Sequence, residues 1–336
     1  MSDHTSPFRH PRQPTAPLRY RPITWQLLAI IALGIFIAPR FIHLDADPHP
    51  GYIDMDSGYQ VDEGYKTFSA KNLMAFGSAK WHPYDIYIGW MKHSPATQWP
   101  YYYAFKSMGL ELKNARLVTL IYATLFFAMT LYFLSKRYGT PLALTAVLLL
   151  TSDVALFHFS RSALFEIALT LFVYTGILIT TRLNADKPVN AALAMLVLMF
   201  IATYTIKRSA VIYYAPPILA CLLLAFFGKQ SSGRKNITHS AWLGLAMLSI
   251  VYLTRKAWLP RINISFDAIL GFPTEFLFNA MPEVSPLALL VGYGCILHLL
   301  IVKPASLFDD IYRLSLTAII VGGPVILALL FSYNPS

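Results

Sequence analysis

Charged residues are scarce in this chain, because Asp, Glu, Lys and Arg make up only 13% of its 336 residues while 56% are hydrophobic. A soluble domain usually has about 25% charged residues. The mean hydropathy of +0.51 is also far above what such a domain needs. The shortage of charge therefore argues against an ordinary soluble domain and predicts an integral membrane protein.

Cysteine is nearly absent too, with only Cys221 and Cys295, which lie inside apolar runs without CxxC spacing. We expect both to pack as small apolar side chains, and neither a disulfide nor a metal site is indicated. The chain also lacks Walker, GxGxxG, HExxH and GxSxG motifs and any basic stripe with interleaved aromatic residues. These absences argue against soluble cofactor chemistry and against a nucleic-acid partner.

Long apolar runs are abundant, and a membrane-spanning helix needs about 20 such residues. We therefore predict an all-α, polytopic integral membrane protein with about nine transmembrane helices. The runs lie near 24–42, 117–134, 141–157, 163–181, 189–205, 210–227, 241–254, 285–302 and 314–332.

The basic residues predict the orientation. Segment 1–23 has four arginines and no acid after Asp3, so the positive-inside rule places it in the cytoplasm and the long segment 43–113 outside. With alternating spans, the inside segments have 13 basic residues against 7 at the short outside positions. The predicted organisation is a cytoplasmic segment, 1–23, followed by a transmembrane domain, 24–336, with the external loop 43–113.

The external loop contains two stretches, 62–76 and 95–108, that we expect to form juxtamembrane helices at the bilayer surface. Their many aromatic residues favour the headgroup zone, where they would act as anchors. The first stretch opens with the adjacent acids Asp62 and Glu63. These acids are candidates for catalysis, but a helix cap or a solvated acidic turn would also explain them.

Four patches resemble the GT-C membrane glycosyltransferases, in particular the protein O-mannosyltransferase and aminoarabinose transferase branch. They are DEGYKTFSAKNLMAFG from Asp62, MKHSPATQWPYYY from Met91, LKNARLVTLIYATL from Leu112 and SRSALFEIALTLF from Ser160. The resemblance covers about 24–230. It departs from the family pattern at Glu166, where an Asp is usual, and at Tyr65, where a basic residue is frequent and here follows as Lys66.

The resemblance implies an inverting glycosyltransferase that moves a sugar from a polyprenyl-phosphate donor to an acceptor glycan, lipid or protein. The active site would face the external or periplasmic side of the plasma membrane. Asp62 is the expected base, since a glycosyl phosphate already has a good leaving group and needs only one essential carboxylate. The expected roles are: catalytic, Asp62, Glu63 and Glu166; donor-phosphate-binding, Lys92, Arg161, Lys207 and Arg208; and sugar- or acceptor-binding, His93 and Tyr65.

Several alternatives stay open. Arg161, Lys207 and Arg208 would also be explained by contact with lipid headgroups or by pairing with Glu166. A divalent ion, Mg or Mn, held by Asp62 and Glu166 suits carboxylate chemistry. The chain could instead be a lipid or solute transporter, or a truncated, non-catalytic accessory subunit, since its end at SYNPS resembles the lead-in to a further segment.

Overall fold

A computed structural model describes 23–46, 59–79, 91, 94–183, 188–207, 209–227, 315 and 318–319. Of these residues 87% are helical and none lies in a strand, so the described part of the chain is all-α. The helices are α1 (Ile23–Ile37), the 3-10 turn η1 (Ala38–Phe41), α2 (Tyr59–Phe76), α4 (Pro95–Met108), α5 (Leu112–Tyr138), α6 (Thr140–Ser152), α7 (Val154–Arg161), α8 (Glu166–Leu183), α9 (Pro188–Thr205) and α10 (Ala210–Phe227).

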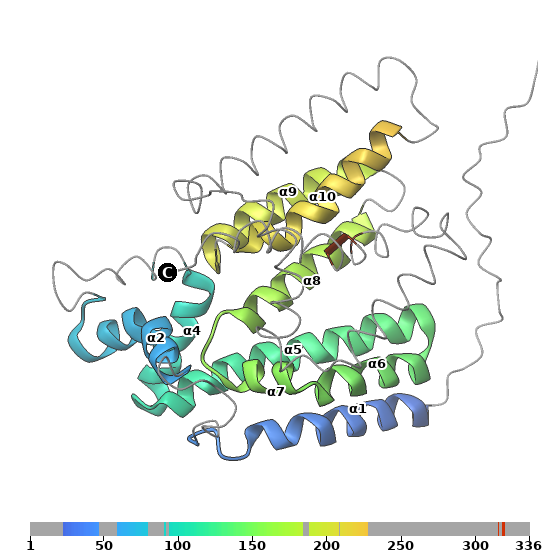
Figure 1. Cartoon of the computed structure of the whole chain (residues 1–336). Coiled ribbons are helices and arrows are strands. Elements are labelled where there is room, and N and C mark those ends of the chain that lie inside the picture. Colours follow the sequence, from blue (N-terminus) through green and yellow to red (C-terminus); the bar gives the residue numbers. More distant parts are fainter. Residues whose placement is uncertain are drawn as a thin grey trace, which may run out of the picture.

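The long helices pack side by side. Helix α5 contacts α6, and α1 lies against α6, while α8 joins this layer to the pair formed by α9 and α10 (Figure 1). Helices α2 and α4 pack against each other and cover one end of the bundle. We call this end the polar end. It contains η1, the start of α5, the turn 162–165 and residues 206–207 after α9.

Helix α5 has the length and composition of a transmembrane helix. Its 27 residues include an 18-residue window of mean hydropathy 2.0, and it is the one described helix that passes both criteria. No charged residue occurs in 117–135, a stretch of about 28 Å at 1.5 Å per residue. The apolar stretches of the other described helices are shorter, at 10–17 residues. The all-helical class is therefore confirmed, and the nine spans stay a prediction.

The expected single span at 141–157 is wrong, because two helices occupy it. Helix α6 ends at Ser152, and Asp153 starts α7 by accepting a hydrogen bond from the backbone N–H of Leu156 at 2.8 Å. A carboxylate at this position satisfies an N–H that the first turn of a helix leaves without a partner. A polar N-cap inside an apolar run thus divides the helix.

The two helices expected in the external loop are present as α2 and α4. Helix α4 contains Pro100, which has no N–H to bond to the carbonyl of Ala96 four residues earlier. The hydroxyl of Tyr122 on α5 donates to that freed carbonyl at 2.5 Å. Because Pro100 leaves the carbonyl of Ala96 without its helical partner, this carbonyl can accept the bond from Tyr122 that joins α4 to α5.

The remaining predicted spans lie largely outside the described residues. This is the case for 241–254 and 285–302, and of 314–332 the structure describes only Ser315, Ala318 and Ile319. Cys221 is buried, as expected for a packing residue.

Candidate functional site

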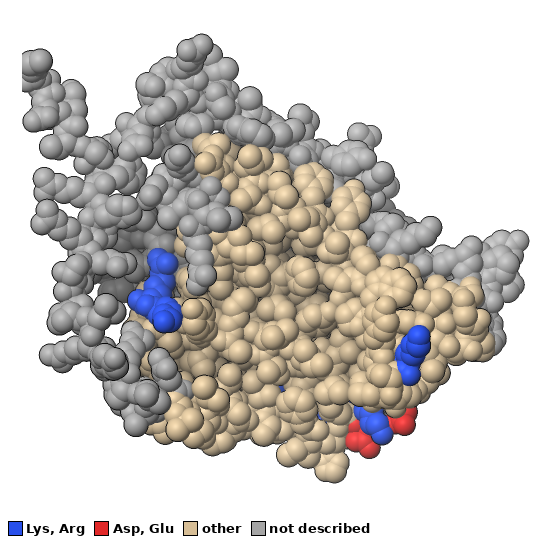
Figure 2. Space-filling model, turned by 180° about the vertical axis from the view of Figure 1, so that it is seen from behind, with Lys and Arg blue, Asp and Glu red and all other residues tan. Residues whose placement is uncertain are grey.

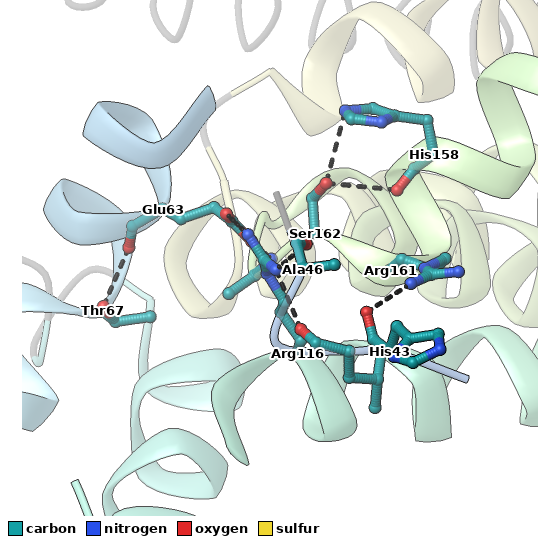
Figure 3. A network of polar contacts seen from close by, with 10 residues as sticks. His43, Ala46, Glu63, Thr67, Arg116, His158, Arg161 and Ser162 are labelled. Atoms are coloured by element: carbon teal, nitrogen blue, oxygen red, sulfur yellow. Dashed lines mark hydrogen bonds and ion pairs between the residues drawn. The ribbon is translucent and has the colours of Figure 1, made fainter. Parts of the chain in front are cut away.

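An ion pair between Glu63 and Arg116 lies at the centre of the polar end (Figure 3). Arg116 donates from Nε to Oε1 at 2.9 Å and from Nη2 to Oε2 at 2.6 Å. The backbone N–H of Ala163 donates to the same Oε1 at 2.5 Å. Both side chains are nearly inaccessible, at 4% for Arg116 and 1% for Glu63. This forked geometry fixes both distance and orientation, so it locks α2 to α5 and to the turn before α8.

Arg116 also holds the chain that follows α1. Its Nη1 donates to the carbonyls of Leu44 at 2.8 Å and Ala46 at 2.7 Å. The Arg116 guanidinium therefore bonds to Ala46, just before the segment 47–62, and to Glu63, just after it. Both sides of this segment are thereby held at the start of α5.

Arg161, a predicted donor-phosphate ligand, is engaged with backbone carbonyls. Its Nη2 donates to the carbonyls of Ile42 and His43, each at 2.8 Å, and its guanidinium lies 5.3 Å from the ring centre of Phe157. Partial burial lowers the pKa of Arg161, and the positive charge of Arg116 lowers it further. The side chain is partly exposed, and its role in binding phosphate stays a prediction.

Arg40 is a buried residue of this end that no sequence motif singled out. In the sequence it is one of the seven basic residues at the short outside positions. It is 1% exposed, and its guanidinium lies 4.9 Å from the centre of the same Phe157 ring. It donates to Phe36 O at 2.8 Å, Thr151 O at 2.6 Å and Ser160 Oγ at 3.0 Å. The first two acceptors belong to the last turns of α1 and α6, where the helix dipole is negative and favours a cation.

Glu166 and Lys207 form a second ion pair at the polar end. Glu166 lies in the first turn of α8, where the helix dipole favours an acid, and Lys207 follows α9. The side chains are 35% and 32% exposed. Of the two carboxylate oxygens, Oε2 is buried and has no hydrogen-bond donor among the described residues. Pairing with Glu166 was one of the alternatives for Lys207, and the structure has this pair.

Tyr101 of α4 connects the surroundings of the two pairs. It is fully buried, its hydroxyl donates to the carbonyl of Leu164 at 3.3 Å, and Thr119 Oγ1 lies at the same distance. Burial raises the pKa of Tyr101, and the charges of Glu166 and Glu63 raise it further. Both carboxylates therefore act on one buried phenol, which stays neutral and serves as a donor.

The start of α4 is fixed to the turn after α9. Ser94 donates from Oγ to the carbonyl of Ile206 at 2.7 Å, next to Lys207. The contact brings the Met91 patch to the same end as the ion pairs.

The other predicted site residues are placed only in part. Asp62 belongs to α2, directly before Glu63, but its side chain is outside the description. Tyr65 is exposed on the same helix, whereas Lys92, His93 and Arg208 lie outside the described residues.

The described residues do not form a metal site. They include no cluster of three or more His, Cys, Asp or Glu side chains that would bind an ion. Glu63 uses both oxygens on Arg116 and Ala163. A divalent ion between Asp62 and Glu166 stays a prediction, because the side chain of Asp62 lies outside the description.

Comparisons with protein-family models, with curated proteins and with solved structures found no match to this chain. The likeness to the GT-C glycosyltransferases therefore depends on the residues of the four patches and on where these residues lie.

Proposed function

We propose that this chain is a polytopic membrane glycosyltransferase that moves a sugar from a polyprenyl-phosphate donor to an acceptor hydroxyl at the external face. One observation carries the proposal. The four patches that resemble this family, which are far apart in the sequence, meet at the polar end. Glu63 bonds to Arg116 and Ala163, and Tyr101 bonds to Leu164.

The surface of the helices supports a lipid environment. Helix α9 exposes several large apolar side chains, although its buried side includes both small and large residues. The exposed set is Leu193, Val197, Ile201 and Tyr204, and the buried set is Ala191, Ala192, Met195, Leu196, Met199 and Ala202. Large exposed apolar areas are rare on soluble monomers. In Figure 2 one broad face has charged residues near its edges and almost none between.

Hydroxyl groups along the helices also suit a medium without water. Thr130, Thr151 and Thr175 each donate to the carbonyl four residues earlier in their own helix. This contact satisfies the hydroxyl without solvent.

In the proposed reaction Asp62 takes the proton from the acceptor hydroxyl. The resulting oxygen attacks the anomeric carbon, and the bond from that carbon to the phosphate oxygen breaks, so the polyprenyl phosphate leaves with the bonding electrons. Attack opposite to the leaving group inverts the configuration. Arg161 and Lys207 would stabilise the departing phosphate, which requires Lys207 to exchange Glu166 for the phosphate.

The test is transfer by the purified full chain in lipid nanodiscs, with a panel of radiolabelled polyprenyl-phosphate sugars and the Asp62→Asn variant. Loss of a general base typically lowers the rate by about 10²–10⁴-fold. Glu111→Gln is the matched control, because Glu111 is an exposed acid near the start of α5 whose one ion-pair partner in the described part of the chain is exposed Lys113. Transfer should persist in the control and be lost in Asp62→Asn, with unchanged thermal unfolding in both. More than about a tenth of the activity in Asp62→Asn would refute its role as base.

A further inference from the structure

The side chain of Gln98 on α4 reaches the backbone of α2. Its Nε2 donates to the carbonyl of Lys66 at 2.5 Å, and its Oε1 accepts from the backbone N–H of Ala70 at 3.2 Å. Gln98 is completely buried, at 0% exposure. The contact belongs to the interface in which α2 and α4 pack against each other (Figure 1).

The two backbone groups that Gln98 bonds are a matched pair. Lys66 and Ala70 are four positions apart, so their C=O and N–H are the acceptor and the donor that an α-helix joins to each other. A carboxamide has its donor and its acceptor at the same end of the side chain and can therefore bond both groups at once. A side chain that enters the hydrogen-bond ladder of a helix is a recognised cause of a local change in helix direction. Gln98 thus acts on the course of α2 at this turn.

Packing alone does not account for an amide at this position. A methionine of similar volume would fill the same space without a polar group that burial makes costly unless it is bonded. The neighbouring Thr97 is also fully buried, but its hydroxyl donates to the carbonyl of Ser94 at the start of α4. Of these two adjacent buried polar side chains, Gln98 is the one that bonds α2. Its two bonds specify one register between α4 and α2.

Gln98 provides a second attachment for the first half of α2. The first attachment is Glu63, whose carboxylate is bonded to Arg116, and the carbonyl held by Gln98 belongs to Lys66, three residues later. One attachment leaves a helix free to tilt about it, whereas two attachments also restrict the tilt. Asp62 directly precedes the first attachment and lies four residues before Lys66. Its backbone therefore belongs to the part of α2 that both attachments hold.

We propose that Gln98 is a positioning residue that fixes the first half of α2 and thereby the backbone of Asp62. The proposal rests on the proposed function, in which Asp62 is the base. Gln98 itself contacts neither donor nor acceptor, because it is buried and its amide is bonded to α2. A base must lie within hydrogen-bond reach of the proton that it takes, and a misplacement of about 1 Å can cost about 10²-fold in rate. Loss of the amide should therefore slow the chemical step and leave donor affinity nearly unchanged.

The experiment compares Gln98→Met with wild type, using the full chain in lipid nanodiscs. Methionine nearly conserves the volume and removes both bonds to α2. Thr97→Val is the matched control, because it removes a buried polar group from the next position of α4 that does not bond α2. Gln98→Asn keeps the carboxamide, shortens its reach by one methylene and replaces Gln98→Met if that variant does not fold. Two quantities are measured: the kcat and donor KM with the polyprenyl-phosphate sugar that the wild type uses best, and the hydrogen exchange of the backbone amides in 59–70.

We expect Gln98→Met to lower kcat by at least about tenfold and to change the donor KM by less than about twofold. Exchange in 59–70 should become about tenfold faster, as the loss of one or two hydrogen bonds implies. Thr97→Val should change neither quantity by more than about twofold. The positioning role is refuted if Gln98→Met keeps its kcat, if its donor KM rises as much as its kcat falls, or if Thr97→Val loses as much kcat. A wild type without transfer would refute the proposed function and the role at Asp62 with it, whereas unchanged exchange in 59–70 would show, whatever the activity, that Gln98 does not hold α2.

Discussion

Gly176 of α8 allows α10 to approach closely, and its replacement by Ala should be strongly destabilising. A Cβ at this position would lie 2.2 Å from the hydroxyl oxygen of Tyr214, 3.1 Å from its Cζ and 3.3 Å from Cδ1 of Leu198. The Tyr214 hydroxyl donates to the carbonyl of Phe172 at 3.1 Å. It would have to withdraw by about 1 Å to reach an ordinary contact, and that movement would break the hydrogen bond.

The cost has two parts. Overpacking in a tight core typically costs about 1–3 kcal/mol, and the lost hydrogen bond about 0.5–1.5 kcal/mol. The higher helix propensity of Ala offsets at most about 1 kcal/mol. We therefore expect Gly176→Ala to lower the free energy of unfolding by about 2 kcal/mol.

Tyr214→Phe provides the decisive comparison, because it removes the atom at 2.2 Å and leaves the contacts at 3.1 and 3.3 Å, which small shifts relieve. Tyr214→Phe by itself should lower the free energy of unfolding by about 1 kcal/mol or less. The double variant should be more stable than Gly176→Ala alone, so the two changes couple favourably. Unfolding in mixed micelles with increasing dodecyl sulfate, followed by tryptophan fluorescence, gives the four free energies.

Gly34→Ala is the matched control. Gly34 lies in the interior of α1, and a Cβ there would meet no atom within 4 Å. This variant should be neutral or slightly stabilised. Equal stability of Gly176→Ala and Gly34→Ala, or a double variant less stable than Gly176→Ala, would refute the close approach of α8 and α10.

Two further predictions concern the polar end and the orientation. Glu63→Gln leaves the buried guanidinium of Arg116 without a carboxylate and should cost about 3–5 kcal/mol in the same unfolding assay, whereas Glu63→Leu combined with Arg116→Met should recover most of that loss. In intact cells, an impermeant thiol reagent should label Ser107→Cys, which is exposed on α4, and should not label Lys136→Cys at the far end of α5; the opposite labelling would invert the topology.

The helices were largely predictable from apolar runs. The runs near 117–134, 189–205 and 210–227 correspond to α5, α9 and α10. The break at Asp153 was not predicted, because averaging hydropathy over a long window hides a single polar residue. The cue was the Asp before a fresh apolar stretch, which is the pattern of an N-cap.

The partners of the charged residues were much less predictable. Glu63 and Arg116 are 53 positions apart. The sequence around each residue gives no sign that the two side chains form an ion pair. Arg161 bonds to backbone carbonyls, which every residue has, so no residue pattern marks them. Pairing with Glu166 was one of two alternatives for Arg161, Lys207 and Arg208, and of these the structure pairs Lys207 with it.

The buried pair separates the roles of the two adjacent acids. An apolar pair of similar size often stabilises a core as well as a buried ion pair does, so stability alone does not account for Glu63 and Arg116. The forked contact additionally fixes the rotation of α2 about its axis, because Glu63 is bonded at both oxygens. Asp62 is the next residue on the same rigid helix, and its backbone position is fixed with it. Glu63→Leu with Arg116→Met therefore tests positioning: a stable but inactive double variant would assign the pair to orientation of α2, and a stable, fully active one would remove that role.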